Sequence, residues 1–181
     1  MLLIQFTGLS GAGKTTIAML VKDKLLAKGI RIEVIDGDEY RKTLCKGLGF
    51  SYNDRVENLR RLGFVGKLLL KHGVISIISA INPFESIRKE LSESSKQVKT
   101  VWVNCNIEVL IERDPKGHYK KALLPDDHPD KIFNFTGIDD VYEKPINPDL
   151  ILFTDKETPE VSAQRLVGFI MKNIDLVAKN C

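Results

Sequence analysis

Residues 8–15 read GLSGAGKT, directly after an apolar run at 2–8 and at the start of an amphipathic segment. The spacing matches G-x-x-x-x-G-K-[ST], whose glycines let backbone N–H groups curl toward phosphate oxygens at a helix N-terminus. Lys14 is then expected to reach the outer phosphates, and the Thr15 hydroxyl to face a Mg²⁺ ion. A purely structural glycine-rich turn is the alternative. The order of strand, motif and helix favours a nucleoside triphosphate, and the absence of an NKxD-type guanine-reading segment favours ATP.

Short apolar runs alternate with amphipathic segments along the rest of the chain. A helix is expected from Lys14 to Gly29, and Thr158-Pro159-Glu160 predicts the start of a last helix that runs through Met171. This alternation predicts an α/β chain of the P-loop NTPase fold, with a parallel five-stranded sheet flanked by helices. We expect one domain over residues 1–181. The expected strands are 2–8, 30–36, 74–81, 98–105 and 150–154.

Composition and charge limit the partners and the cellular location that we expect for the chain. The formal net charge is +3 with acidic and basic residues interleaved, so nucleic acid is not an expected partner. Cys45, Cys105 and Cys181 are odd in number and widely spaced, which indicates neither a disulfide framework nor a zinc site. No signal peptide or membrane-length apolar stretch is found, and we expect a cytoplasmic location without a membrane partner.

Residues 114–148 are the irregular part of the sequence, rich in Pro, Asp and Lys. Structureless segments of this length inside a compact domain are usually functional lids or disordered loops. We interpret this region as a lid, and the sequence leaves open whether it is ordered without a ligand.

Two carboxylates follow the second expected strand, in IDGDEYR at 35–41. Ligands of open α/β sheets bind at the carboxyl ends of the strands, so Asp36 and Asp38 are expected beside the nucleotide. One could orient the waters of the metal and the other could accept a proton from an attacking hydroxyl. Alternatively, they are a helix N-cap and a turn former. Arg41 could pair with Asp38 or bind an anion.

The stretch GFSYNDRVENLRRLG at 49–63 predicts a helix with polar residues on its buried side. Ser51 and Asp54 have the form of a capping box. At about 100° per residue, Arg55 and Asn58 share a sector with the apolar residue Leu62. A buried guanidinium needs an internal carboxylate or an anionic ligand, and the sequence alone favours the internal ion pair.

Six segments in this order resemble the adenylylsulfate (APS) kinase family over roughly residues 2–155. The family transfers the γ-phosphoryl group of ATP to the ribose 3′-hydroxyl of adenosine 5′-phosphosulfate, and its members are usually homodimers. The segments are GLSGAGKTT, DGDEYR, LGFSYNDRVENLRRLG, AINPFESIR, ERDPKGHYKKA and FTGIDDVYEKP.

The resemblance implies a role for each matching residue. Asp38 is the expected base, supported by Asp36 and by the charge of Lys14, and Thr15 with Asp36 would hold Mg²⁺. Phe50 and Phe135 are implied to stack on the adenine, although their apolar character alone indicates core residues. The implied ATP contacts are Gly8, Ser10, Gly11, Ala12, Gly13, Lys14, Thr15 and Thr16. The implied acceptor and lid contacts are Asp38, Arg41, Phe50, Arg55, Asn58, Ile81, Asn82, Lys116, Phe135, Thr136 and Gly137.

The chain departs from the family pattern at three places. Glu39 stands where the family usually has Asn, Asn82 stands in place of a serine, and LLPDDHPDK replaces a short basic lid linker. Because a carboxamide cannot form a stable phosphate ester, Asn82 excludes a phosphoenzyme at this position. The lid departure leaves open a nucleotide acceptor with another 5′ group. A sugar-acid kinase and a non-catalytic nucleotide sensor are further alternatives, which the aromatic residues and the intact Lys14 respectively disfavour.

Overall fold

The computed structural model describes residues 1–179, with side-chain burial described up to residue 174. Cys181, one of the three cysteines expected to form neither a disulfide framework nor a zinc site, lies outside the described residues. The expected strands are all present, each within three residues of its predicted bounds. They are β1 (Leu3–Thr7), β2 (Ile32–Asp36), β3 (Ile75–Ser79), β4 (Val98–Asn104) and β5 (Leu150–Phe153). The helices are α1 (Lys14–Leu26), α2 (Gly37–Tyr40), α3 (Tyr52–Lys71), α4 (Glu85–Glu93), α5 (Ile107–Arg113), α6 (His118–Ala122) and α7 (Pro159–Lys179).

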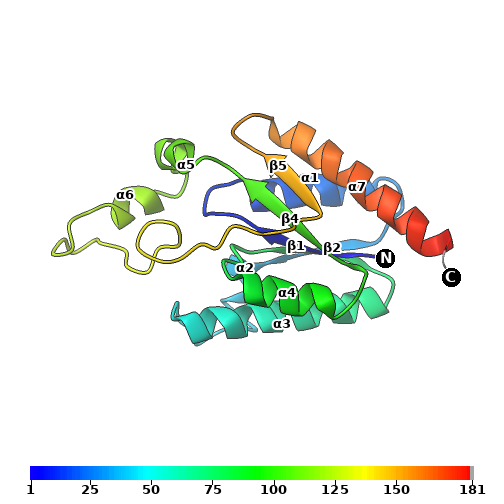
Figure 1. Ribbon diagram of the computed structural model, residues 1–181, viewed down its shortest axis with the longest axis horizontal. Helices are drawn as coiled ribbons and strands as arrows, with labels where there is room; N and C mark the ends of the chain where they lie inside the picture. Colours follow the sequence, from blue (N-terminus) through cyan, green and yellow to red (C-terminus); the bar gives the residue numbers. More distant parts are fainter. Residues whose placement is uncertain (180–181) are drawn as a thin grey trace.

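The five strands form one parallel sheet in the order β2-β3-β1-β4-β5. Helices α1 and α7 pack together on one face, and α3 and α4 cover the other, which gives three layers (Figure 1). Because β1 lies between β3 and β4, the segments that leave all three strands emerge side by side at one edge of the sheet. The predicted fold class is confirmed.

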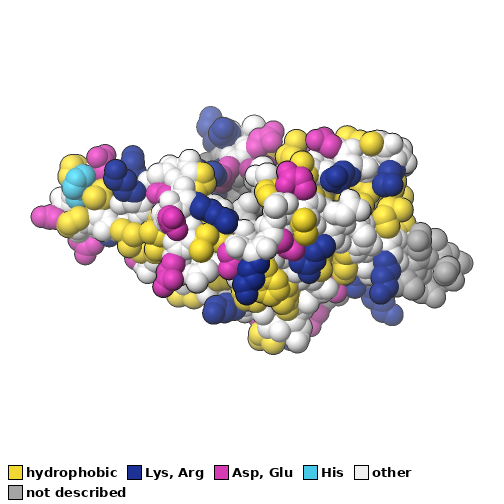
Figure 2. Space-filling model, turned by 90° about the horizontal axis from the view of Figure 1, so that it is seen from above, with side chains coloured by type: hydrophobic (Ala, Val, Ile, Leu, Met, Phe, Trp, Pro, Cys, Tyr) yellow, Lys and Arg dark blue, Asp and Glu magenta, His cyan; other side chains and the backbone are white. Residues whose placement is uncertain are grey.

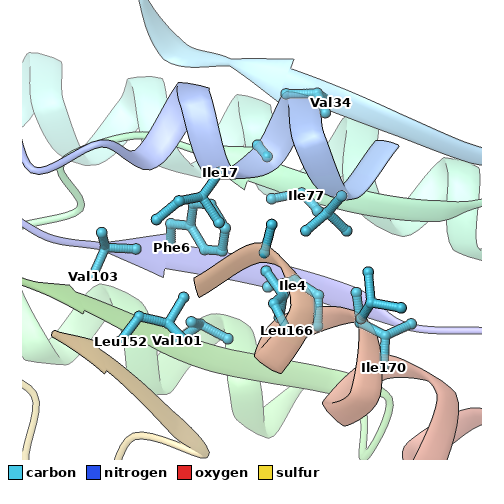
Figure 3. Close-up of a cluster of buried hydrophobic side chains, with 14 of the residues drawn as sticks. Ile4, Phe6, Ile17, Val34, Ile77, Val101, Val103, Leu152, Leu166 and Ile170 are labelled. Atoms are coloured by element: carbon cyan, nitrogen blue, oxygen red, sulfur yellow. The ribbon is translucent and has the colours of Figure 1, made fainter. Parts of the chain in front are cut away.

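Alternation of side chains along the strands divides the core between the two faces of the sheet. Ile4 and Phe6 of β1 pack with α1 and α7, whereas Leu3 faces the α3 side. Figure 3 shows the first of these clusters, where Ile17 of α1 and Leu166 of α7 meet the strand residues. Burial on both faces explains why the strands read as nearly continuous apolar runs.

Helix α3 begins where the capping box predicts. The backbone N–H of Asp54 donates to the Ser51 hydroxyl at 3.2 Å. The predicted inward face, including Arg55 and Asn58, is buried. A Cβ at Gly66 would lie 2.6 Å from Leu3 Cδ1, so glycine at this position allows the helix to approach β1 closely.

The irregular region 114–148 contains the five-residue helix α6 and otherwise extended or turning chain. It projects from the sheet at the left of Figure 1, on the same side as the loops that leave β1 and β2. The LLPDDHPDK segment, residues 123–131, forms a closed loop. Lys131 Nζ, at its end, donates to the carbonyls of Ala122 at 2.8 Å and Leu124 at 2.7 Å, at its start. We call residues 114–148 the lid.

The surface carries interspersed charges of both signs, as Figure 2 shows for one face. None of the helices in residues 1–179 combines the length and apolar character needed to cross a membrane.

The core assignment predicts the effect of one truncation in α7. Leu166 is fully buried, so Leu166→Ala should lower the free energy of unfolding by about 2–5 kcal/mol. Val161 on the same helix is 47% exposed, and Val161→Ala should change it by less than about 0.5 kcal/mol. Denaturant unfolding measures both, and equal losses would contradict the packing described here.

Candidate active site

The turn between β1 and α1 has the backbone shape that the motif predicts. Gly11 and Gly13 adopt positive φ angles of 73° and 90°, and no side chain caps the first turn of α1. A Cβ at Gly8 would lie 2.3 Å from the carbonyl oxygen of Val103, so the turn passes too close to β4 for any other residue. The N-terminus of α1 therefore offers backbone N–H groups to an anion.

Lys14 is folded back over this turn. Its Nζ donates to the carbonyl oxygens of Gly8 at 2.9 Å and Leu9 at 2.7 Å, and the residue is 9% exposed. Burial lowers the pKa of Lys14 to about 8, although the nearby carboxylates of Asp38 and Asp36 oppose the shift. The ammonium is thus a charge in a poorly hydrated position that a phosphate would stabilise.

Thr15, Asp36 and Ser79 meet at the edge of the sheet. Thr15 Oγ1 donates to Asp36 Oδ2 at 2.7 Å and lies 3.1 Å from Ser79 Oγ. The other oxygen of Asp36 accepts from the backbone N–H groups of Asp38 and Glu39, so Asp36 also caps α2. The capping alternative is therefore correct for Asp36, and it holds the carboxylate beside Thr15. The sequence analysis did not identify Ser79, although its place at the end of β3 could have indicated it.

Asp38 contacts the lid. Lys116 Nζ lies 2.7 Å from Asp38 Oδ2, and both side chains are more than half exposed. Burial raises the pKa of the Asp38 carboxyl, but the hydrogen bond and charge of Lys116, with help from Lys14 and Arg41, outweigh it and leave the pKa below its ordinary value. Asp38 is consequently ionised at neutral pH.

Arg55 has an internal carboxylate partner, as the sequence alone favoured. Its Nη2 lies 3.1 Å from Asp140 Oδ2 in the lid, and its Nη1 donates to Thr136 Oγ1 at 3.0 Å. Burial lowers the pKa of Arg55, and the charge of Asp140 opposes this effect. Arg55 nevertheless lines both cavities of the cleft.

Three neighbours of Arg55 complete this side of the site. Arg41 donates to the carbonyl of Gly49 at 2.9 Å, and its guanidinium carbon lies 4.5 Å from the centre of the Phe50 ring. The Phe50 side chain is 59% exposed, so it is not a core residue. Asn58 is buried, and its Oδ1 has no hydrogen-bond partner among the described residues. A buried acceptor of this kind is costly unless a ligand or water satisfies it.

Phe135 forms part of the lid wall. It is half-buried and packs edge-on against Tyr119 at a centroid distance of 5.0 Å. Both Phe50 and Phe135 line the main cavity, but whether they enclose a base between them stays a prediction.

The lid rests on the glycine-rich turn. Tyr119 Oη donates to the carbonyl of Ser10 at 3.0 Å. Gly137 has a φ of 93°, and a Cβ there would lie 2.6 Å from Leu9 Cδ2. The lid therefore contacts the glycine-rich turn directly, at residues 9 and 10.

Asn82 occupies a left-handed backbone conformation with a φ of 47°, which asparagine tolerates better than most residues. Its Nδ2 donates to Gln5 Oε1 at 3.0 Å. The residue is 3% exposed and lines the smaller of the cavities described next. Contact with a substrate stays a prediction.

A cavity of about 570 Å³ joins the turn after β1 to the lid, and a smaller one of about 80 Å³ continues from it. Among the predicted residues, Gly8, Ala12 and Gly137 line neither cavity. The predicted residues that do line them are Ser10, Gly11, Gly13, Lys14, Thr15, Thr16, Asp36, Asp38, Arg41, Phe50, Arg55, Asn58, Ile81, Asn82, Lys116, Phe135 and Thr136. Lining residues that the sequence analysis missed include Ser79, Ala80, Pro115, His118, Ile132, Phe133 and Asn134.

Comparison with known proteins agrees with this geometry. The sequence model of the family described as adenylylsulphate kinase matches residues 1–153. An adenylyl-sulfate kinase of Rippkaea orientalis is 48% identical over 177 residues, covering 94% of this chain and 95% of the relative. A probable bifunctional SAT/APS kinase of Sorangium cellulosum is 46% identical, and the match covers 91% of this chain but only 28% of that longer protein.

Among solved structures, the APS kinase CysC of Mycobacterium tuberculosis in complex with AMPPNP and APS superposes with a TM-score of 0.86. It is 40% identical, and the match covers 94% of this chain and 97% of that one. The match to the family model spans the motif after β1, the Asp36–Asp38 edge, α3 and the whole lid. The chain belongs to the adenylylsulfate kinase family and is an ATP-dependent phosphotransferase that acts on an alcohol.

Proposed function

We propose that the cleft is where this adenylyl-sulfate kinase transfers the γ-phosphoryl group of ATP to the ribose 3′-hydroxyl of adenosine 5′-phosphosulfate. The supporting observation is that one cavity joins the glycine-rich turn to Asp38, Phe50, Arg55 and the lid. The triphosphate of ATP would lie on the turn, because backbone N–H groups and Lys14 are directed there. The acceptor nucleotide would lie toward Phe50 and Arg55.

Asp38 is our candidate for the general base. Its lowered pKa keeps it ionised, as an acceptor for the proton of the 3′-hydroxyl must be. Lys116 donates to Asp38 Oδ2, so the acceptor hydroxyl would use the other carboxylate oxygen or displace Lys116. Lys14 and Arg55 would stabilise negative charge on the two nucleotides, which is the main contribution a kinase makes to phosphoryl transfer.

Mg²⁺ fits the donors that Thr15 and Asp36 present. A hydroxyl and a carboxylate are hard oxygen ligands, and Mg²⁺ typically takes few ligands from protein and others from phosphate and water. When bound, the ion would neutralise charge on the phosphate oxygens. Thr15 and Asp36 would hold the ion together, because the Thr15 hydroxyl could ligate it through a lone pair and still donate to Asp36.

We propose that residues 1–181 act as a single kinase domain with residues 114–148 as its lid, in a cytoplasmic homodimer, as the family resemblance implies. Sedimentation equilibrium of the purified chain tests the dimer, and a monomer at micromolar concentration would refute it.

An acceptor screen tests the substrate. ADP release should be stimulated by adenosine 5′-phosphosulfate, and weakly or not at all by adenosine nucleotides with another 5′ group, by sugar acids or by buffer alone. Stimulation by a sugar acid alone would overturn the proposal. Equal stimulation by another 5′-substituted nucleotide would show that the 5′ group is not recognised.

The pKa of Lys14 predicts how ATP affinity depends on pH. Phosphate oxygens bind the ammonium and not the neutral amine, so binding takes up a proton once the pH exceeds the pKa of the free enzyme, which is about 8. Affinity for ATP should therefore be level below pH 8 and fall by up to about tenfold per pH unit above it. Calorimetry or a fluorescent ATP analogue measures this fall.

Lys14→Met tests whether Lys14 causes the pH dependence of ATP affinity. It should bind ATP more weakly at pH 7, show a much flatter pH profile and lose about 10²-fold or more in kcat. Lys28→Met, an exposed lysine just after α1, is the control and should behave as the unmodified chain. Parallel pH profiles of Lys14→Met and the unmodified chain would refute the assignment.

Arg55 and Asp38 should have separable effects on kinetics. Arg55→Ala should raise the KM of the acceptor by about 10–100-fold with little change for ATP, because a charged hydrogen bond contributes about 1.5–3 kcal/mol. Asp38→Asn should mainly lower kcat, by about 10²-fold or more. Asp140→Asn is the control, because it breaks the ion pair of Arg55 and leaves the guanidinium in the cleft. If Asp140→Asn matched Arg55→Ala, the arginine would be structural.

Asn82 predicts direct transfer without a phosphoenzyme. γ-labelled ATP without acceptor should leave no label on the protein, and labelled product should appear when adenosine 5′-phosphosulfate is added. Asn82→Ser should change kcat only modestly but lower the free energy of unfolding by about 1 kcal/mol, because Gln5 Oε1 loses its donor. Label on the protein in the absence of acceptor is the result that would disprove direct transfer.

A further inference from the structure

Arg88 of α4 is the largest side chain that is fully buried, with 2% of its surface exposed. Its guanidinium donates to the carbonyl oxygen of Asn82 at 2.6 Å and to that of Glu143 at 2.6 Å. It also pairs with Glu85 Oε2 at 2.7 Å. One side chain thus joins α4, the turn after β3 and the C-terminal part of the lid.

The same cluster includes the end of β1. Thr7 Oγ1 lies 2.9 Å from Tyr142 Oη and donates to the carbonyl of Asn82 at 2.9 Å. Thr7 is the last residue of β1, directly before the glycine-rich turn. β1, the strand before the glycine-rich turn, therefore holds both Tyr142, near the C-terminal end of the lid, and Asn82, on the proposed acceptor side of the cleft.

Stability alone does not require this arrangement. Glu85 lies three residues before Arg88 on the same helix, and a more exposed arginine could keep that pair without burial. Burying a guanidinium is costly unless its donors are satisfied. Glu85 Oε2 accepts from two of its nitrogens, and two carbonyls in other segments accept the further hydrogen bonds that burial requires. One of them belongs to Asn82, whose left-handed backbone needs support from its surroundings.

We infer that Arg88 is a positioning residue for the transfer reaction, and this inference rests on the proposed function. Arg88 lines neither cavity of the cleft, so it acts through the residues that it holds. Through Asn82 it fixes one wall of the acceptor side, and through Glu143 it fixes the end of the lid that carries Phe135 and Thr136. Toward the glycine-rich turn its contact is weaker, because Arg88 Nη1 lies 3.4 Å from Thr7 Oγ1.

The test compares two variants in steady-state kinetics with ATP and adenosine 5′-phosphosulfate. Arg88→Lys keeps the charge but cannot reach all three partners, and Tyr142→Phe removes only the hydroxyl that meets Thr7. We expect the acceptor's KM to rise about tenfold in Arg88→Lys and about threefold to fivefold in Tyr142→Phe, with the KM of ATP within about twofold. Thermal unfolding is measured alongside, so that a loss of stability is separated from a loss of acceptor binding.

Arg60→Gln is the matched control. Arg60 forms an exposed bidentate pair with Glu90 between α3 and α4, so its loss loosens the same helix without touching the buried cluster. Both KM values should stay within about twofold in this variant. Arg60→Gln behaving like Arg88→Lys would overturn the inference, because any disturbance of α4 would then suffice.

The remaining outcomes separate the inference from the function on which it rests. The positioning role is wrong if Arg88→Lys and Tyr142→Phe are folded and active but leave the KM of the acceptor unchanged. It is also wrong if they raise the KM of the acceptor and the KM of ATP equally. If Arg88→Lys does not fold, Tyr142→Phe decides the question alone, because it preserves volume and charge. If the unmodified chain fails to phosphorylate adenosine 5′-phosphosulfate, the proposed function itself is refuted.

Discussion

Parallel pairing of β1 with β3 on one side and β4 on the other sets the position of every part of the cleft. Because the strands run in one direction, the turn after β1 and Ser79 of β3 emerge at the same edge, and Asp36 of β2 joins them through the pairing of β2 with β3. Thr15 reaches both of these side chains within 3.1 Å. A change of register in β1 would move the glycine-rich turn away from the carboxylates that it must work with.

The pKa values in the cleft follow from this convergence of charged side chains at one edge of the sheet. Lys14 is drawn out of water by the turn that it covers, and its pKa falls to about 8 although two carboxylates lie nearby. Burial raises the pKa of Asp38, but Lys116 comes from the lid and brings this pKa below its ordinary value. Positive charge from the turn, from α3 and from the lid therefore converges on one cavity, which suits two nucleotides carrying several negative charges.

The lid is fastened near both ends to β1 and to the glycine-rich turn that follows it. Tyr119 donates to the Ser10 carbonyl near the start of the lid, and Tyr142 meets Thr7 near its end. Between these points, Arg55 of α3 contacts Thr136 and Asp140. The arrangement limits where the lid can bend, because its two ends are held by buried or half-buried hydroxyls while its middle carries the exposed LLPDDHPDK excursion.

The sequence by itself determined the elements whose signals are local. The glycine spacing at 8–15, the capping box at Ser51 and the inward face of α3 depend on residues within one or two turns of each other, so spacing alone predicts them. The five strands and most of the residues that line the cleft were predictable for the same reason, or from the family resemblance.

Only the tertiary structure decided which distant groups meet. Lys116 and Asp38 are 78 positions apart, and Arg55 and Thr136 are 81 apart, so no local spacing selects these partners from the other charged and polar residues. The order of the strands and the buried cluster around Arg88 were missed for this reason. Such contacts depend on how the sheet, helices and lid pack, and packing is decided by the whole chain at once.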